Sequence, residues 1–321
     1  MRDQSLSKIA VLLFDPVPAN RELTHDALLN LGGHDLGVPT SLDDARALLA
    51  QNNYDLLILD ATDDDGHICG AIGGLRHSRL GRDPFAVVLA TMWRESAALS
   101  RKLVNAGVDD ILLQPISTAL LQTRIRQQVY ARKPFVVTST YIGPDRRGDQ
   151  RAQIGEVRIP VPNSLREKLV GTASAIMIAN AVMNASAVVN EQRVAQSASK
   201  IGVFCALILE APEKSPEAES DIAAMKSTIA DLARWANPKQ FGAVVFHCET
   251  LAKLAEQADT AQIRRSLGQI AVETRAIRRK LDPEKDAEGL NAEIANAARR
   301  LAAHRTMEAA HSAARRAGSR A

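Results

Sequence analysis

Polar side chains follow four apolar runs in the N-terminal third of the chain, at the points where strands are predicted to end. Asp60 closes the run Leu56–Leu59, whose unbroken hydrophobicity is typical of a strand buried on both faces. Asp15, Thr91 and Gln114 take the equivalent place on three other runs. The carboxyl ends of parallel strands lie at one edge of an open α/β sheet, where ligands and chemistry collect. The sequence therefore predicts a site at that edge, built from two carboxylates, a hydroxyl and an amide.

The elements that must position these residues alternate between short strands and amphipathic helices from residue 8 to residue 132. Strands are predicted at residues 8–14, 35–38, 55–60, 85–91 and 111–113, and helices at 20–31, from Ser41, 72–80, 95–105 and 117–131. Such alternation predicts a doubly wound parallel sheet of the flavodoxin-like α/β class, with five strands in the order 2-1-3-4-5.

The rest of the chain is predicted to be helical after a connecting stretch. Residues 133–163 contain glycine, proline and arginine in turn-forming patterns, which predicts a linker with an arginine-bearing turn. Ser164 and Glu167 form a capping-box pattern that predicts the start of a long alanine-rich helix. Further helices are predicted at 219–236, 238–257, 260–281 and 285–310. Residues 164–310 are therefore expected to form an all-α bundle for output or oligomerisation, followed by a basic tail at 311–321.

Composition limits the classes of protein to which the chain can belong. A net charge of +3 and an aromatic content of 3% provide neither a broad basic surface nor stacking platforms, so DNA is not expected as a partner. Cys69, Cys205 and Cys248 are widely spaced and odd in number, which favours reduced thiols. The first residues lack an apolar signal core, so a cytoplasmic location is expected. Residues 169–189 carry no charge, but their many alanines, serines and asparagines favour a buried helix over a membrane span.

Residues 8–132, about two-fifths of the chain, resemble the receiver domain of two-component response regulators. The resemblance rests on an ordered set of positions: Asp15, Asp60, Thr91, the run Gly107-Val108-Asp109-Asp110, and Pro115. It implies that Asp60 is a phosphoryl acceptor for a histidine kinase or a phosphotransfer protein. It also implies that Thr91 binds a phosphoryl oxygen in the phosphorylated state.

The same resemblance implies a magnesium site. In the family, an acidic pair after the first strand helps to hold Mg²⁺; in this chain Asp15, Asp60 and the backbone of Thr62 would be the ligands. Phe14 replaces the first acid of the pair, so the affinity for Mg²⁺ is expected to be weak. Asp63, Asp64 and Asp65 could restore part of the negative field.

The strand that ends at Gln114 departs furthest from the family. A lysine normally occupies this position and neutralises the phosphoryl group, so the neutral Gln114 predicts slow and incomplete phosphorylation. Ile111 stands where the family usually carries an aromatic switch residue, and the loop at 61–66 is shorter than usual. The bond between Gln114 and Pro115 is expected to be cis, as it is in the family.

Two motifs outside the receiver-like region also bear on function. Residues 141–147, with the sequence YIGPDRR, resemble a tail found on some bacterial receiver proteins and are expected to pack on the receiver-like domain or the bundle. Arg146, Arg147 and Arg151 suit phosphate or carboxylate recognition, and the spacing of the last two resembles that of cyclic di-GMP-binding PilZ domains. His247 lies within a predicted helix, where a structural role is favoured over phosphotransfer.

These observations predict a bacterial signal-transduction protein that is not an enzyme. The first hypothesis is a divergent response regulator that relays to a helical output domain and a protein output partner. The second is a phosphorylation-independent scaffold on the same fold, and the third is a cyclic dinucleotide effector acting through Arg146, Arg147 and Arg151. Weakly bound Mg²⁺ is the expected cofactor, and the sequence leaves homodimerisation open.

Overall fold

The computed structural model describes residues 6–62, 66–146, 158–212, 215–236, 238–256, 260–284 and 286–318. The chain divides into two compact units, one up to Val189 and the other from Asn190 onward. This boundary lies later than the expected one at residue 164, because elements that follow the receiver-like region share a hydrophobic core with Phe85 of that region.

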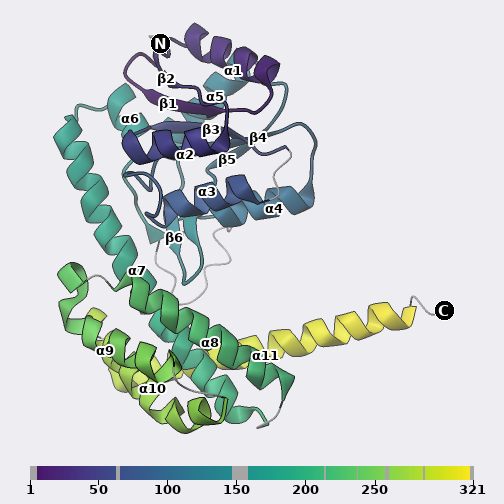
Figure 1. Cartoon of the computed structure of the whole chain (residues 1–321), viewed down its shortest axis with the longest axis vertical. Coiled ribbons are helices and arrows are strands. Elements are labelled where there is room, and N and C mark those ends of the chain that lie inside the picture. The colour runs from purple at the N-terminus through teal and green to yellow at the C-terminus, as the bar shows by residue number, and fades with distance from the viewer. Residues whose placement is uncertain are drawn as a thin grey trace. The chain divides into compact units, whose positions relative to one another are not determined.

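The first unit contains a five-stranded parallel sheet (Figure 1). Its strands are β1 (Ala10–Phe14), β2 (Asp35–Gly37), β3 (Leu56–Asp60), β4 (Val87–Met92) and β5 (Asp110–Leu113). Their order is β2-β1-β3-β4-β5, and every neighbouring pair is parallel. The predicted flavodoxin-like topology is therefore confirmed.

Helices cover both faces of this sheet. They are α1 (Pro18–Asn30), α2 (Leu42–Gln51), α3 (His67–Arg76), α4 (Ala97–Ala106) and α5 (Thr118–Ala131). Successive strand residues point to opposite faces. Leu57 and Val88 therefore share a core with α2, α3 and α4, whereas Ile58 and Leu89 share a core with α1 and α5. This double coverage explains why the strands have continuous apolar sequences.

α3 begins earlier and ends earlier than its predicted range of 72–80. Glycines at positions 70, 73 and 74 lower the helix propensity of this stretch, which made its first turn difficult to recognise. The helix forms because Ile68, Ile72 and Leu75 bury their side chains against the sheet. Tertiary packing here overrides local propensity.

A small antiparallel sheet occupies part of the stretch at 133–163 that was predicted to be a linker. It has the order β7-β6-β8, with β6 (Phe135–Val137), β7 (Ile142–Pro144) and β8 (Arg158–Ile159). Phe135 and Ile142 are fully buried in a core that also contains Phe85. Gly143 and Pro144, which the sequence suggested as a turn, lie within strand β7.

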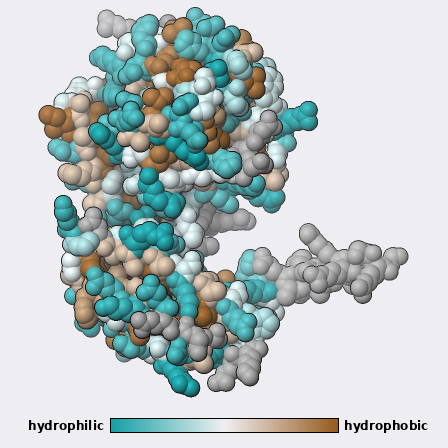
Figure 2. Space-filling model, viewed as in Figure 1, coloured by the Kyte–Doolittle hydropathy of each residue, from teal (hydrophilic) through white to brown (hydrophobic). Residues whose placement is uncertain are grey.

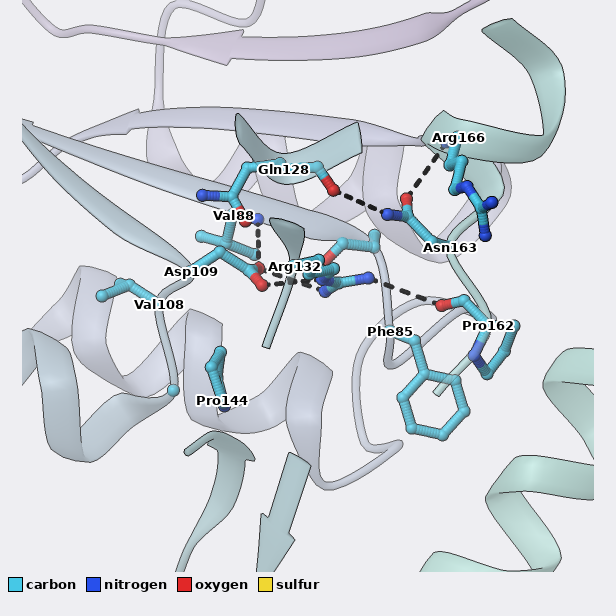
Figure 3. A network of polar contacts seen from close by, with 12 residues as sticks. Phe85, Val88, Val108, Asp109, Gln128, Arg132, Pro144, Pro162, Asn163 and Arg166 are labelled. Atoms are coloured by element: carbon cyan, nitrogen blue, oxygen red, sulfur yellow. Dashed lines mark hydrogen bonds and ion pairs between the residues drawn. The ribbon is translucent and has the colours of Figure 1, made fainter. Parts of the chain in front are cut away.

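A buried ionic network fastens this small sheet to the flavodoxin-like domain (Figure 3). Asp109, at the start of β5, accepts hydrogen bonds from the backbone N–H of Val88 and from two guanidinium groups. Arg76 Nη2 lies 2.7 Å from Asp109 Oδ2, and Arg132 Nε lies 2.8 Å from Oδ1. Both guanidinium groups also lie over the ring of Phe135, at 5.1 and 5.2 Å from its centroid.

The charged groups of the network are paired with opposite charges and have further hydrogen-bond partners. Arg76 also donates to the backbone carbonyls of Pro84, Ala86 and Gly107. Burial alone would raise the pKa of Asp109, but the charges of Arg132 and Arg76 hold this pKa below its ordinary value. The resulting stabilisation is present above the ordinary carboxyl pKa of 3.8 and is lost as the pH falls through the lowered value.

A short helix and a long one replace the single helix predicted to begin at Ser164. α6 (Ser164–Leu169) is capped by Asn163, whose Oδ1 accepts from the backbone N–H of Arg166 and whose Nδ2 donates to the carbonyl of Gln128 (Figure 3). The chain leaves helical geometry after Leu169, and α7 (Ala175–Glu210) starts a new helix.

The second unit comprises the later part of α7 with α8 (Pro216–Trp235), α9 (Pro238–Glu256), α10 (Thr260–Leu281) and α11 (Ala287–Gly318). Apolar side chains from all five helices form one core, which confirms that the C-terminal region is helical. α11 continues to Gly318, so most of the predicted tail is helical. Among the helices described, none is both long and apolar enough to cross a membrane.

The buried network leads to a prediction about stability. Asp109→Asn should lower the free energy of unfolding of the first unit by about 3–5 kcal/mol, because two buried guanidinium groups lose their counter-charge. The neighbouring Asp110→Asn is the matched control: its ion pair with Arg124 is partly exposed, so about 1 kcal/mol or less is expected. Urea unfolding followed by Trp93 fluorescence in a Trp235→Phe background measures both. Equal effects of the two substitutions would contradict the prediction.

Candidate functional site

The structure brings the four strand-end side chains together at one edge of the parallel sheet. Gln114 is their common neighbour: its Nε2 lies 3.1 Å from Asp15 Oδ2, 3.2 Å from Thr91 Oγ1 and 3.3 Å from Asp60 Oδ1. Asp60 and Thr91 lie at the C-terminal ends of β3 and β4, and Asp15 and Gln114 directly follow β1 and β5. Parallel pairing of these strands sets their ends side by side. The convergence expected from the sequence is therefore present.

Asp60 is almost fully buried and is surrounded by neutral donors. Its Oδ1 accepts hydrogen bonds from Thr62 Oγ1 at 2.8 Å and from Thr91 Oγ1 at 3.1 Å, in addition to the Gln114 amide. Its Oδ2 accepts from the backbone N–H of Thr62 at 3.3 Å. Thr62 therefore contacts Asp60 through its own side chain and its N–H.

Asp15 is 2% exposed and shares the Gln114 amide with Asp60. Burial raises the pKa of Asp15 above its ordinary value, and the nearby charge of Asp60 adds to this effect. Hydrogen bonds from the backbone N–H of Val17 and from Gln114 act in the opposite direction. The site therefore holds two carboxylates under mutual repulsion, with the Gln114 amide donating to both.

Sequence reasoning overlooked Arg21 as a neighbour of the site. Its Nη1 donates to the backbone carbonyl of Asp15 at 2.7 Å, and its charge lowers the pKa of the Asp15 carboxyl slightly against the larger effect of burial. A basic residue six positions after a strand-end aspartate, in the first turns of the next helix, is the sequence signal that could have identified it. No ion pair joins Arg21 to either carboxylate within the described ranges.

The residues that depart from the family pattern have structural roles. Phe14 packs its ring into the core between the sheet and α2, α3 and α4, so it is turned away from the edge that Asp15 occupies. Ile111 packs against the same core from β5. The peptide bond between Gln114 and Pro115 is cis, as expected.

The groups that the site offers as metal ligands suit Mg²⁺ poorly. Asp15 and Asp60 offer carboxylate oxygens, which are the right ligands, but the N–H group of Gln114 is directed at both. Among the residues that the structure describes, no group of three or more histidine, cysteine, aspartate or glutamate side chains could hold a metal ion. Asp63, Asp64 and Asp65 lie outside the described residues.

The YIGPDRR segment packs on the first unit, as expected. Arg146 Nη2 donates to the backbone carbonyls of Val108 and Asp109, next to the buried ionic network. Tyr141 donates its hydroxyl to the carbonyl of Pro144 at 2.8 Å, which closes the turn. Arg147 and Arg151 lie outside the described residues. The described part of the motif therefore has a structural role that is sufficient to explain it.

A hollow of about 480 Å³ adjoins this segment, lined by the end of α4 and by the β6–β7 hairpin. Arg146 is the one arginine among its described lining residues, and this arginine is already bonded to two carbonyls. In the second unit, His247 Nδ1 lies 2.6 Å from Glu273 Oε2, and both side chains are mostly buried. This contact between α9 and α10 is consistent with the structural role expected of His247.

No family model and no curated protein matches the chain. Similar solved structures include the chemotaxis protein CheY4 of Vibrio cholerae (16% identity, 37% of this chain and 98% of that chain, TM-score 0.33) and an orphan response regulator of H. pylori (23%, 38% and 97%, 0.32). A signal receiver domain of a two-component histidine kinase from Clostridium thermocellum is also similar (21%, 37% and 95%, 0.33).

The domain formed by β1 to β5 and α1 to α5 has the receiver fold. Its strand order, its helices on both faces and its polar strand ends are those expected from the sequence. Each of these solved structures covers less than two-fifths of the chain.

The raised pKa of Asp15 leads to a second prediction. Asp15→Asn should stabilise the first unit at pH 7, since it removes a buried charge while its Oδ1 can keep the bond from Val17. Its Nδ2 then faces Gln114, whose amide turns to present its carbonyl oxygen as the acceptor. Folding raises the pKa of Asp15 above 3.8, so the charged carboxylate destabilises the folded state. This destabilisation is absent at low pH, where Asp15 is protonated in both states, and it grows as the pH rises from 3.8 through the raised pKa. The extra stability of Asp15→Asn should therefore appear over the same pH range and stay constant at higher pH.

Urea unfolding over a pH series, with a carboxyl NMR titration of Asp15, measures this gain. The matched control is Asp26→Asn, which removes an exposed charge from α1 and should leave stability nearly unchanged. An Asp15 that titrates below 3.8, or a variant that is less stable at pH 7, would be evidence against the described electrostatics.

Proposed function

We propose that the chain is a signal-transduction protein whose receiver-fold domain acts through protein–protein contacts and is, at best, a slow phosphoryl acceptor. The observation that carries this proposal is the position of the Gln114 amide, within hydrogen-bonding distance of Asp15, Asp60 and Thr91. A neutral group occupies the place from which the resemblance leads one to expect a cation.

Phosphoryl transfer depends on positioning and on neutralising the negative charge of the phosphoryl group. Phosphorylation of Asp60 would replace its single carboxylate charge by about 1.5 to 2 negative charges, beside the buried carboxylate of Asp15. Gln114 can donate one hydrogen bond to such a group but cannot offset its charge, and charge-assisted hydrogen bonds are roughly twice as strong as neutral ones. Arg21 is the nearby cation, but it is bonded to the backbone of Asp15.

The geometry supports a role for the site that needs no phosphoryl group. Gln114 links the ends of β1, β3, β4 and β5 through hydrogen bonds to three other side chains. These contacts join the strand ends through protein side chains alone. A domain stabilised in this way is suited to present a constant surface to a histidine kinase, a phosphotransfer protein or an output partner.

Phosphorylation of Asp60 remains the second candidate function, because one feature favours it. Thr91 Oγ1 lies 3.1 Å from Asp60 Oδ1, so the hydroxyl is close to where a phosphoryl oxygen would lie. The two candidates differ in how fast and how far the protein is labelled. The cyclic dinucleotide hypothesis has no comparable support from the described residues.

The third prediction separates these candidates. Incubation with acetyl phosphate or with beryllofluoride and Mg²⁺ should label the wild-type protein slowly and incompletely, as followed by mass spectrometry and by NMR. Gln114→Lys should raise the yield by about tenfold or more, because it supplies a fixed positive charge at the phosphoryl oxygens. Gln127→Lys is the matched control, since it adds the same charge at an exposed position of α5.

Asp60→Asn should abolish any label, leave the fold intact and change signalling modestly. Fast and complete labelling of the wild-type protein, together with loss of signalling in Asp60→Asn, would instead identify an ordinary phosphorylated response regulator. A Gln127→Lys variant that gains as much label as Gln114→Lys would show that the charge acts non-specifically.

A further inference from the structure

The N-terminal part of α7, residues 175–189, presents an exposed apolar surface. Ile176 is 74% exposed, Met177 61%, Met183 63% and Val188 51%. The chain carries no charged residue from Val170 to Asn190, although charged residues make up 24% of the whole. We call the surface formed by these four side chains, together with Asn180 and Asn184, the α7 face.

The opposite side of the same helical segment is already buried. Val182 and Val189 share a core with Phe135 of the small antiparallel sheet, and Ala185 packs against that core. A helix that is apolar around its whole circumference is normally buried on all sides. Exposed clusters of large apolar side chains mark surfaces that bind a partner. Figure 2 shows brown, hydrophobic residues at the left edge of the view, where Figure 1 places the beginning of α7.

We propose that the α7 face binds the same face of a second copy of this chain and forms a two-fold symmetric dimer. The lack of charge on the α7 face is our reason for choosing a second copy as the partner. The face is neutral along its whole length, so a charged partner surface would lose its hydration without gaining an ion pair. A second copy offers an equally neutral, equally apolar helix, and a two-fold axis pairs one patch with itself.

The spacing of the exposed residues fits two paired helices. The exposed Ile176, Asn180 and Met183 and the half-buried Ala187 follow one another at intervals of four, three and four residues, which is the spacing of a coiled-coil seam. Asn180 is exposed within this seam. A side-chain amide carries both donors and acceptors, so Asn180 can hydrogen-bond to its own copy, and one such polar residue in a seam specifies register and dimerisation.

Met183 lies one heptad after Ile176 and at the middle of the α7 face. A two-fold axis through the centre of the face therefore brings the two copies of Met183 close together, whether the paired helices are parallel or antiparallel. This consequence can be tested without knowing the direction of pairing. The proposal is independent of the chemistry at Asp60, so it stands or falls separately from the proposed function.

The fourth prediction concerns the oligomeric state of the full chain. Sedimentation velocity and light scattering over a wide concentration range should show a dimer of the wild-type protein. Met183→Glu should weaken dimerisation by about a hundredfold or more, because it places an unpaired charge at the centre of the interface. Met307→Glu is the matched control: Met307 has the same 63% exposure on α11, and its substitution should leave the dimer intact.

Chemical cross-linking provides a second readout that does not require the dimer to be weakened. Met183→Cys in a Cys69→Ser background should form a covalent dimer with a short bis-maleimide, whereas Met307→Cys should not. A wild-type protein that is monomeric at all concentrations would overturn the proposal. So would a dimer that is unaffected by Met183→Glu, or a monomer that binds vesicles of phosphatidylcholine and phosphatidylglycerol through the α7 face.

Discussion

The first unit depends on the ion pairs and hydrogen bonds that the buried carboxylate of Asp109 makes. It accepts hydrogen bonds from two guanidinium groups and from a backbone N–H of β4, and its side chain is only 1% exposed. Arg76 ends α3 and Arg132 follows α5, so one carboxylate ties both helices to the start of β5. Removing one partner from such a group is costly, because the remaining charges stay buried.

The same network explains why the small antiparallel sheet belongs to the first unit. Phe135 lies beneath both guanidinium groups, and Arg146 bonds to the carbonyls next to the buried carboxylate. The YIGPDRR segment thus acts as a fastening between this sheet and the receiver fold. The guanidinium group of Arg146 donates to backbone carbonyls, so these contacts account for its position.

The opposite edge of the parallel sheet has a different electrostatic character. Two buried carboxylates share hydrogen bonds from one neutral amide, and the nearby cation, Arg21, is bonded to the backbone carbonyl of Asp15. The polar side chains still lie together at the strand ends, but a neutral amide stands at position 114, where the resemblance implies a lysine. This combination is the basis of our proposal that the domain acts through protein–protein contacts. The neutral α7 face extends that idea, since absence of charge there favours self-association.

Much of the fold follows from the sequence, because local patterns reflect burial on both faces of a parallel sheet. The strands around Asp60 and Thr91, their common edge and their order were predictable from apolar runs and their polar ends. The small sheet was not, since strands of two or three residues around Gly143 carry too little periodicity to distinguish them from turns. The early start of α3 was hidden by glycines, and only packing of Ile68 and Ile72 reveals it.

At the site, the sequence by itself determined which chemical groups are present: two acids, a hydroxyl and an amide, with no lysine at Gln114. The tertiary structure decided how they interact. Gln114 contacts three of its neighbours across 23 to 99 residues of chain, and Asp109 meets Arg76 across 33. Such contacts depend on the side-chain directions that a completed sheet imposes, which no local pattern encodes. The identity of the groups is therefore a property of the sequence, whereas their electrostatic coupling is a property of the fold.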